Sequence, residues 1–464
     1  MREFLKDCLK NESGFVELRY HKKEGKSIAA EKDRIENTQV KKRAGIGIRV
    51  LHKGTWGFSS TGEISKESIM KGIQIAKKSA ELSSAVRAEK INFLPKANFA
   101  IGEFIGKGIE EIQKKTLEEK IALVLNTTKN SKSLSNKLQS VVCGYSEVYE
   151  EKAIVTTDGA DSFFAYVRPE FKVNAVASRD GELQSGTESI GVTGGWDCLF
   201  KDKKPDELGQ MACKTAIDLL DSSFPIGGNT TVILAPSIVG LLVHEAIGHT
   251  VEADFVLAGS VAAGKIGTRV GSDLVTLSDS GLSEFYEGAG GSIPVDDEGV
   301  ITENTVIIRN GILVSYLHNR ETANRFGVTP TGSARAWEYS DIPLIRMRNT
   351  YLMPGTSTLE EMISSTKDGY LLEGPKNGQA DSTGEFMFGV QKAFKIQNGK
   401  IIKMVKGVTV SGIAFDVMNQ VDMVSKEFKW DLGSGYCGKG QPAKVDAGGP
   451  YIRTKAKLGG TKGD

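Results

Sequence analysis

The sequence predicts an α+β fold, in which an α/β N-terminal region is followed by a β-rich, antiparallel C-terminal domain. Three observations support this prediction. Helical stripes and strand-like alternation are interspersed before residue 224. Residues 224–229, FPIGGN, are typical of a linker. Beyond about residue 265, short glycine-rich β-like segments predominate and helical stripes are few.

The linker sets the predicted domain boundary. We expect an N-terminal region over residues 1–223, which could divide into 1–100 and 101–223, and a C-terminal domain over 224–464. A chain of 464 residues is long enough for two or three domains with substantial cores.

The first elements are strands followed by a helix. Residues 15–24 and 44–58 alternate as strands do, with a hairpin turn at 52–55. Residues 66–83 predict an amphipathic helix, because isoleucines and alanines recur on one stripe and Ser65 can cap its first turn.

The rest of the N-terminal region continues this mixture. Residues 117–127 predict a helix that opens with a capping-box pattern. Residues 140–196 predict antiparallel strands, with Asp-Gly turn signals at 158–159 and 180–181. A helix is predicted over 206–221.

The C-terminal domain begins with a strand and a helix. Residues 230–235 are β-like, and Pro236 opens an apolar helix. We find no internal repeat or low-complexity tract. The tail after Gly448 contains several glycines and lysines, and we expect it to fray or to lie on the surface.

Composition excludes several classes of protein. Lys+Arg number 59 and Asp+Glu 58, so the formal charge of +1 gives no reason to expect nucleic acid or membrane-surface binding. The N-terminus lacks the apolar segment of a secretory signal, and no apolar run is long enough to cross a bilayer. Five widely spaced cysteines argue against a disulfide scaffold and favour a cytoplasmic location.

The most specific motif is His244-Glu245-Ala246-Ile247-Gly248-His249, because it uses two of only five histidines and brackets a glutamate. Two imidazoles beside a carboxylate are what a zinc hydrolase needs. The alternative is a pair of unrelated core histidines. An unpaired glutamate in an apolar run would be costly, so we favour a metal site.

The histidine spacing predicts a local distortion. Histidines five residues apart diverge by roughly 140° on an ideal α-helix. A π-type turn with i→i+5 bonding returns them to one face, and Gly248 would tolerate it. We therefore expect a bulged helix between His244 and His249.

A third metal ligand is not fixed by the motif. Catalytic zinc usually keeps three protein ligands and one water. A carboxylate close to the motif could coordinate the ion or accept a histidine N–H instead. A cysteine in a glycine-rich loop is poorly placed for core packing, although buried inert cysteines are common. The candidates are Glu252, Asp254, His318 and Cys437.

The cysteine loop also carries two nucleotide-binding patterns that we discount. Residues 433–439 fit GxxxxGK, and 433–438 fit GxGxxG. Gly440 occupies the place of the required Ser or Thr, and Pro442 follows where a helix should run.

Glu245 has a clear candidate role. Directly after the first histidine, it is positioned to act as general base and to pass a proton to a leaving amine. The alternative is a glutamate that only hydrogen-bonds a histidine.

The motif and five further blocks resemble the TldD/PmbA metallopeptidase family, over nearly the whole chain. The residues that carry the resemblance are HEAIGHTVEAD at 244–254, AGIGIRVLHKGTWGFSSTGEIS at 44–65, DDEGV at 296–300, NGILVSYLHNR at 310–320, TGSARAWEYSDIPLIRMRNTYLMPG at 331–355 and GYCGKGQ at 435–441. Because the motif is intact, the chain resembles the TldD-type subunit.

This resemblance implies a site and a substrate class. It implies one Zn²⁺ held by His244, His249 and Cys437, with Glu245 as base, so that Glu252 would lie behind the ligands. It also implies unfolded or flexible peptides as substrates, cut with little sequence preference. The implied partner is a second copy or a motif-lacking PmbA-type paralogue. We further expect substrates to add as a strand to an exposed edge, because main-chain bonds are common to all peptides.

Four residues in the C-terminal blocks are candidates for substrate binding. Arg335, Arg346 and Arg348 could clamp a peptide carboxylate or stabilise an oxyanion, and His318 could donate to the reacting group. We expect structural salt bridges for at least two of the arginines and a hydrogen-bonded structural role for the histidine.

Two other functions compete with this interpretation. A non-catalytic regulatory subunit could close a structural zinc site with four ligands, Glu252 being the fourth. HEAIGH also resembles the HExxGH motif of dipeptidyl peptidase III, which would imply exopeptidase action on short peptides.

Overall fold

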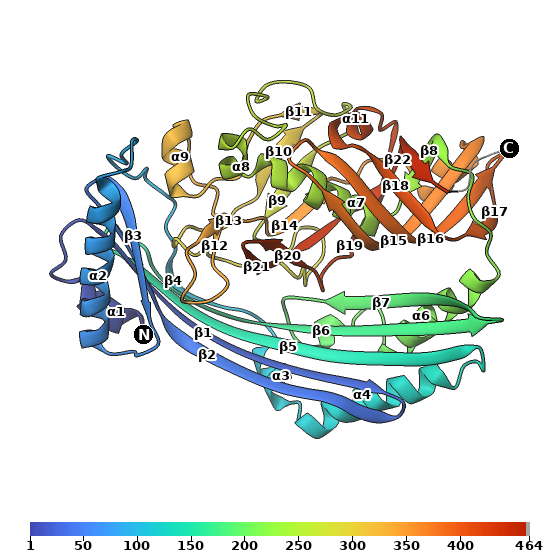
Figure 1. The fold of residues 1–464 in the computed structure, drawn as a ribbon, viewed down its shortest axis with the longest axis horizontal. Coiled ribbons are helices and arrows are strands. Elements are labelled where there is room, and N and C mark those ends of the chain that lie inside the picture. Colours follow the sequence, from blue (N-terminus) through green and yellow to red (C-terminus); the bar gives the residue numbers. More distant parts are fainter. Residues whose placement is uncertain (461–464) are drawn as a thin grey trace.

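Two large sheets organise the protein, whose computed structural model describes residues 1–460. A seven-stranded sheet is built from the N-terminal region and an eleven-stranded sheet from the C-terminal part. Long strands of the first sheet curve along one side of the C-terminal elements (Figure 1). The predicted α+β class with a β-rich C-terminal part is confirmed.

The N-terminal sheet has the order β3-β2-β1-β5-β6-β4, and β7 also pairs with β6. All its pairs are antiparallel except β4 with β6. Its strands are β1 (Phe15–Glu31), β2 (Arg34–His52), β3 (Thr55–Thr61), β4 (Ile101–Ile105), β5 (Leu138–Thr156), β6 (Asp161–Arg179) and β7 (Glu182–Gly191).

The N-terminal helices pack against this sheet. They are α1 (Arg2–Leu9), α2 (Lys66–Ser84), α3 (Ile109–Lys114), α4 (Leu117–Lys132), α5 (Trp196–Leu199) and α6 (Pro205–Leu220). The predicted cap on α2 is confirmed, since Ser65 accepts from the Ser68 amide. The capping box of α4 is confirmed as well. No helix within residues 1–460 combines the length and apolarity needed to cross a membrane.

Strands β1 and β2 are much longer than predicted. They extend to a turn at Lys32 and Asp33, both with positive φ. The residues near this turn are mostly exposed or half-buried, so alternation does not mark them as strand. Main-chain pairing with β2 and β5 holds β1 as a strand there.

The C-terminal part contains the second sheet and two short hairpins. Its strands are β8 (Gly228–Leu234), β9 (Leu277–Ser280), β10 (Thr305–Arg309), β11 (Ile312–Leu313), β12 (Ala334–Arg335), β13 (Leu344–Ile345), β14 (Asn349–Leu352), β15 (Asp368–Ala380), β16 (Glu385–Gln397), β17 (Lys400–Val405), β18 (Val408–Ile413), β19 (Met423–Trp430), β20 (Tyr436–Lys439), β21 (Gln441–Lys444) and β22 (Asp446–Gly459). Its helices are α7 (Pro236–Leu242), α8 (Ala253–Leu257), α9 (Arg320–Phe326), α10 (Leu359–Ser364) and α11 (Ala414–Asn419).

Five of these strands close on themselves, because β8, β15, β16, β18 and β22 pair in sequence and β22 pairs back with β8. Two pairs of the second sheet, β8 with β15 and β14 with β22, are parallel, so it is not wholly antiparallel as expected. Helix α7 packs against β22, and its apolar side chains belong to the largest core cluster. This core fixes the helix from which the His244 segment continues.

The expected frayed tail is wrong. Strand β22 lies between β14 and β18 and also pairs with β8 and β19. Alternate residues in its second half, such as Ile452 and Leu458, are buried, while lysines between them point outward. Glycines at its start permit close packing against α7 and β19, and their presence hid the alternation.

Buried ion pairs join the two parts of the chain. Lys152 of β5 donates to both oxygens of Asp297, at 2.8 and 2.9 Å. Arg49 of β2 pairs with Glu298 at 2.6 Å and with Glu17 at 2.8 Å. Breaking a buried pair leaves an uncompensated charge, so these contacts hold the N-terminal sheet against the C-terminal part.

The approach of α7 to β22 gives a stability test. A Cβ on Gly240 would lie 2.8 Å from the carbonyl carbon of Ala447, a main-chain atom that cannot rotate away. We expect Gly240→Ala to lower the free energy of unfolding by about 1–3 kcal/mol in urea titrations. Gly25→Ala is the control, because its nearest neighbour is 3.9 Å away. Equal stability of the two variants would contradict this packing.

Candidate metal centre

A π-helical turn carries the motif. Helix α7 runs directly into a π-helical segment, Val243–Gly248, followed by a 3₁₀ turn, His249–Val251. The amide of His249 donates to the carbonyl of His244, an i→i+5 bond. The two rings consequently share one side of the helix, with centroids 5.4 Å apart. The predicted bulge is confirmed.

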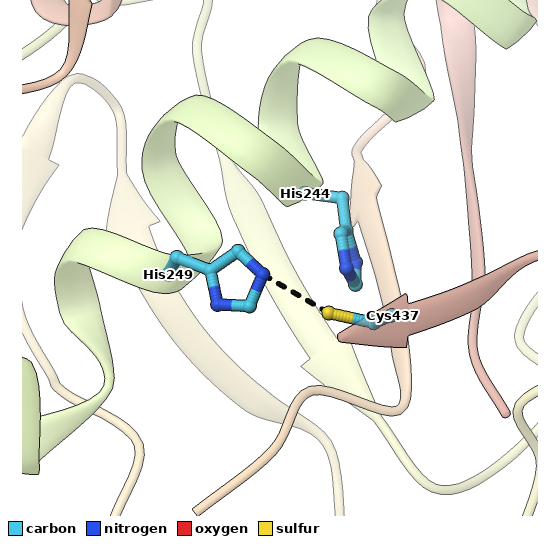
Figure 2. Close-up of side chains that lie close together, drawn as sticks. All are labelled: His244, His249 and Cys437. Atoms are coloured by element: carbon cyan, nitrogen blue, oxygen red, sulfur yellow. Dashed lines mark hydrogen bonds between the residues drawn. The ribbon is translucent and has the colours of Figure 1, made fainter. Parts of the chain in front are cut away.

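Cys437 reaches the two histidines from a different part of the chain. It lies on β20, which forms a hairpin with β21. Its Sγ is 3.0 Å from His249 Nε2, and Figure 2 shows the three side chains converging from the helix and the strand. One donor atom from each residue lies within 4.8 Å of the others.

Charges at this site favour a thiolate. Burial opposes ionisation of Cys437, but the neighbouring His244 and His249 imidazoles outweigh it and lower the pKa of the thiol to about 5. A thiolate and imidazole nitrogens are ligands that zinc prefers.

His244 provides a further reason to expect an ion. The residue is buried, and neither of its ring nitrogens has a hydrogen-bond partner among the described residues. A buried polar group without a partner is costly. A metal bound between His244, His249 and Cys437 would satisfy one of these nitrogens, so the residues present fit such an ion.

Glu252 holds the second histidine from behind. It is fully buried, and its Oε2 lies 2.9 Å from His249 Nδ1. Such carboxylate–histidine contacts orient the ring and raise its basicity towards a metal. Of the two roles that the sequence left open for Glu252, this contact matches the acceptor behind a ligand.

Lys439 ties the cysteine hairpin to the motif. Its Nζ donates to Glu252 Oε2 at 3.0 Å, to Asp254 Oδ1 at 2.8 Å and to the carbonyl of Ile345 at 3.0 Å. From the sequence we assigned this lysine no structural role, and we noted it only in the cysteine loop. Strand periodicity could have found it, because residues two apart share a face and Lys439 follows Cys437 by two.

Glu245 borders a pocket beside the three candidate ligands. The side chain is about one-third exposed, and its Oε2 is 3.8 Å from His249 Nε2. A cavity of about 300 Å³ is lined by Glu245 and His249 together with residues from α8, β15 and β20. Glu245 therefore presents its carboxyl group to this cavity beside the candidate ligands.

The three candidate arginines all lie in the interior. Arg348 pairs with Asp279, with 2.6 Å between Nε and Oδ1. Arg346 donates to the carbonyls of Cys437 and Gln441, both at 2.6 Å, and Arg335 to those of Met347 and Lys444. We expected salt bridges for at least two of these arginines, and that expectation is wrong: among the described residues only Arg348 makes one, whereas Arg335 and Arg346 bind main-chain carbonyls.

Arg346 and Arg335 anchor the β20–β21 hairpin, because their carbonyl partners include residues of β20 and β21.

His318 lies apart from the three candidate ligands. It is buried, its Nδ1 is 3.2 Å from Thr322 Oγ1, and burial lowers its pKa to about 4. This contact agrees with the hydrogen-bonded structural role that we expected.

Family models match three successive parts of the chain. Residues 16–80 match domain 1, residues 110–220 the central domain and residues 227–460 the C-terminal domain of PmbA/TldA metallopeptidases.

Related sequences span nearly the whole chain. A metalloprotease of Methanocaldococcus jannaschii is 36% identical over 96% of this chain and 96% of its own length. A zinc metalloprotease TldD homolog of Saccharolobus solfataricus is 31% identical over 99% of this chain and all of its own. TldE from Thermococcus kodakarensis shares the fold, with a TM-score of 0.80, 18% identity and 99% coverage of both chains.

The contact behind His249 predicts a change in metal affinity. Glu252→Gln keeps the side-chain shape but removes the charge beside Nδ1, so we expect zinc affinity to fall about 10–100-fold in chelator competition. Asp254→Asn is the matched control. It alters another partner of Lys439 without touching His249, and we expect a change of at most about threefold. Equal losses in both variants would rule out a specific effect through His249.

Proposed function

Since this chain belongs to the PmbA/TldD metallopeptidase family, we propose that it is a zinc-dependent peptidase that cuts unfolded or flexible peptides with low sequence preference. The observation that carries the proposal is the convergence of His244, His249 and Cys437 beside a cavity that Glu245 borders. This convergence supports a site in which an acid–base group and a metal-binding set share one surface.

The residues divide the chemistry between them. His244, His249 and the Cys437 thiolate would hold the ion, which when bound supplies Lewis acidity and makes water easier to deprotonate. Glu245 takes the proton of the attacking water and passes it to the leaving amine. A thiolate donates more charge than a carboxylate would, so a bound ion would be a milder Lewis acid and more would depend on Glu245.

An open site favours catalysis over a structural role. Structural zinc sites are closed by four protein ligands. Within residues 1–460, the clustered donors are the two histidines and the cysteine, while Glu252 lies outside this cluster with its Oε2 in contact with His249 and Lys439. This arrangement supports a peptidase rather than a regulatory subunit with structural zinc.

Substitution of Glu245 distinguishes a peptidase from a regulatory subunit with structural zinc. We expect Glu245→Gln to retain one zinc per chain by mass spectrometry and to lose casein cleavage by about 10²–10⁴-fold. Fragments from the wild type should arise by cleavage at internal bonds. An active Glu245→Gln variant would exclude the proposed base, and release of dipeptides alone would favour the dipeptidyl-peptidase-like exopeptidase.

We also propose that substrates bind by adding a strand to β20, and Gly438 carries this argument. Gly438 is opposite Pro442 in the hairpin. Pro442 has no N–H to donate to Gly438. In alternate pairs of an antiparallel ladder the main-chain groups point away from the partner strand, and we infer that Gly438 and Pro442 form such a pair. The bond from the Val445 amide to the Gly435 carbonyl fits this alternation.

The open edge of β20 borders the cavity, where a peptide could lie. Gly438 is exposed and lines the cavity, and a Cβ added to it would meet no atom within 4 Å. A peptide paired with Gly438 would use main-chain bonds that every sequence offers, which accounts for low sequence preference.

Two substitutions at this position test strand addition. Gly438→Pro removes the N–H, and we expect KM to rise about 10-fold while zinc content stays at one per chain. Gly438→Ala keeps the N–H in a position with room for a methyl group, so we expect KM to change little. Strand addition at Gly438 would be wrong if both variants bound peptide as the wild type does.

A further inference from the structure

Two hydroxyl groups in the lining of the cavity beside Glu245 already donate to main-chain carbonyls. Thr250 donates its hydroxyl to the carbonyl of Ile247 at 2.7 Å, and Ser260 donates to the carbonyl of Thr250 at 2.6 Å. Both residues are buried. Their hydroxyl protons are already used inside the protein, so neither residue has a donor left for a substrate.

The ammonium group of Lys439, which also lines this cavity, already has hydrogen-bond partners. Lys439 directs its ammonium group to Glu252, Asp254 and the Ile345 carbonyl, which accounts for its three protons. The same Nζ lies 4.3 Å from the centroid of the Phe255 ring. An acidic substrate side chain would have to displace these partners, so Lys439 does not make the cavity a site for acids.

Phe255 and Ala380 provide the apolar part of the lining. Phe255, on α8, remains 37% exposed and lies edge-to-face with His249, with ring centroids 6.2 Å apart. Ala380, at the end of β15, contributes only a methyl group and so leaves room. At the cavity mouth, exposed Asp381 adds negative charge that disfavours acidic residues further.

We propose that this cavity is a side-chain subsite that accepts a large apolar residue, aromatic or long aliphatic, next to the bond that is cut. The inference rests on the proposed peptidase function. It adds a side-chain preference at one substrate position, while the main chain of the substrate still binds without regard to sequence. The volume of about 300 Å³ lies at the lower end of that of ligand pockets, which suits a single large side chain. Phe255 offers such a residue an aromatic contact.

The preference is tested with a set of quenched fluorescent peptides that differ at one residue beside the scissile bond, on either side, as Phe, Leu, Ala, Asp or Lys. We expect the wild type to cleave the Phe and Leu peptides about 10-fold more efficiently than the Asp peptide, in kcat/KM. Phe255→Ala should reduce this ratio, and Ala380→Leu, which fills the cavity, should shift the preference towards Ala.

Controls separate the subsite from the metal site. Phe93→Ala removes an exposed phenylalanine of the N-terminal region and should leave the ratio unchanged. Zinc content and the melting temperature are measured for each variant, because Phe255 also contacts His249. A ratio near one in the wild type, or one unchanged in both cavity variants, would overturn the proposal.

Binding provides an independent readout. The same peptides, labelled with fluorescein, are titrated onto the Glu245→Gln protein and followed by anisotropy. We expect tighter binding of the Phe and Leu peptides, and loss of that difference when Phe255→Ala is added. If the wild type cleaves no peptide, the proposed peptidase function fails and this titration alone decides whether the cavity selects apolar side chains; equal affinities would then exclude the subsite.

Discussion

One main-chain hydrogen bond, from the amide of His249 to the carbonyl of His244, decides where both imidazoles point. In a regular α-helix the rings would diverge by roughly 140° and could not approach one sulfur atom together. The π-turn interrupts the regular α-helical hydrogen bonding. The apolar packing of α7 against β22 holds the π-turn in place. The proposed chemistry depends on this local distortion because a metal needs both rings.

The hairpin that carries Cys437 is held by charged side chains as well as by a small apolar cluster of Cys437, Ala443 and Val445. Lys439 joins the cysteine strand to Glu252 and Asp254, and Arg346 binds the Cys437 carbonyl from within the protein. Lys444, at the end of the hairpin, pairs with Glu170 of the N-terminal sheet. The N-terminal sheet thereby supports the hairpin that carries the thiol.

Local signals predicted the local structure well. Helices α2 and α4 have their apolar stripe and their cap within one segment, and the five-residue histidine spacing by itself pointed to a π-turn. Strand β22 was missed because its initial glycines mask the alternation of buried residues that follows. The long ends of β1 and β2 were missed because neither face there is well buried.

Long-range features were harder to predict. Cys437 is 188 positions from His249, and no spacing rule links them, so the family resemblance was needed to decide between Cys437 and Glu252. Lys439 and Phe255 acquire their roles from neighbours that the fold brings together. Sequence reasoning identifies the chemistry of a motif, whereas the shape and charge of the surrounding cavity follow from tertiary contacts.

X-ray absorption spectroscopy of the zinc-loaded protein tests the central claim most directly. We expect one sulfur neighbour at about 2.3 Å and nitrogen or oxygen neighbours at about 2.0–2.1 Å, with two of them imidazoles. The sulfur signal should vanish in Cys437→Ser. A wild-type spectrum without sulfur, or with four protein ligands closing the site, would contradict an open centre built from His244, His249 and Cys437.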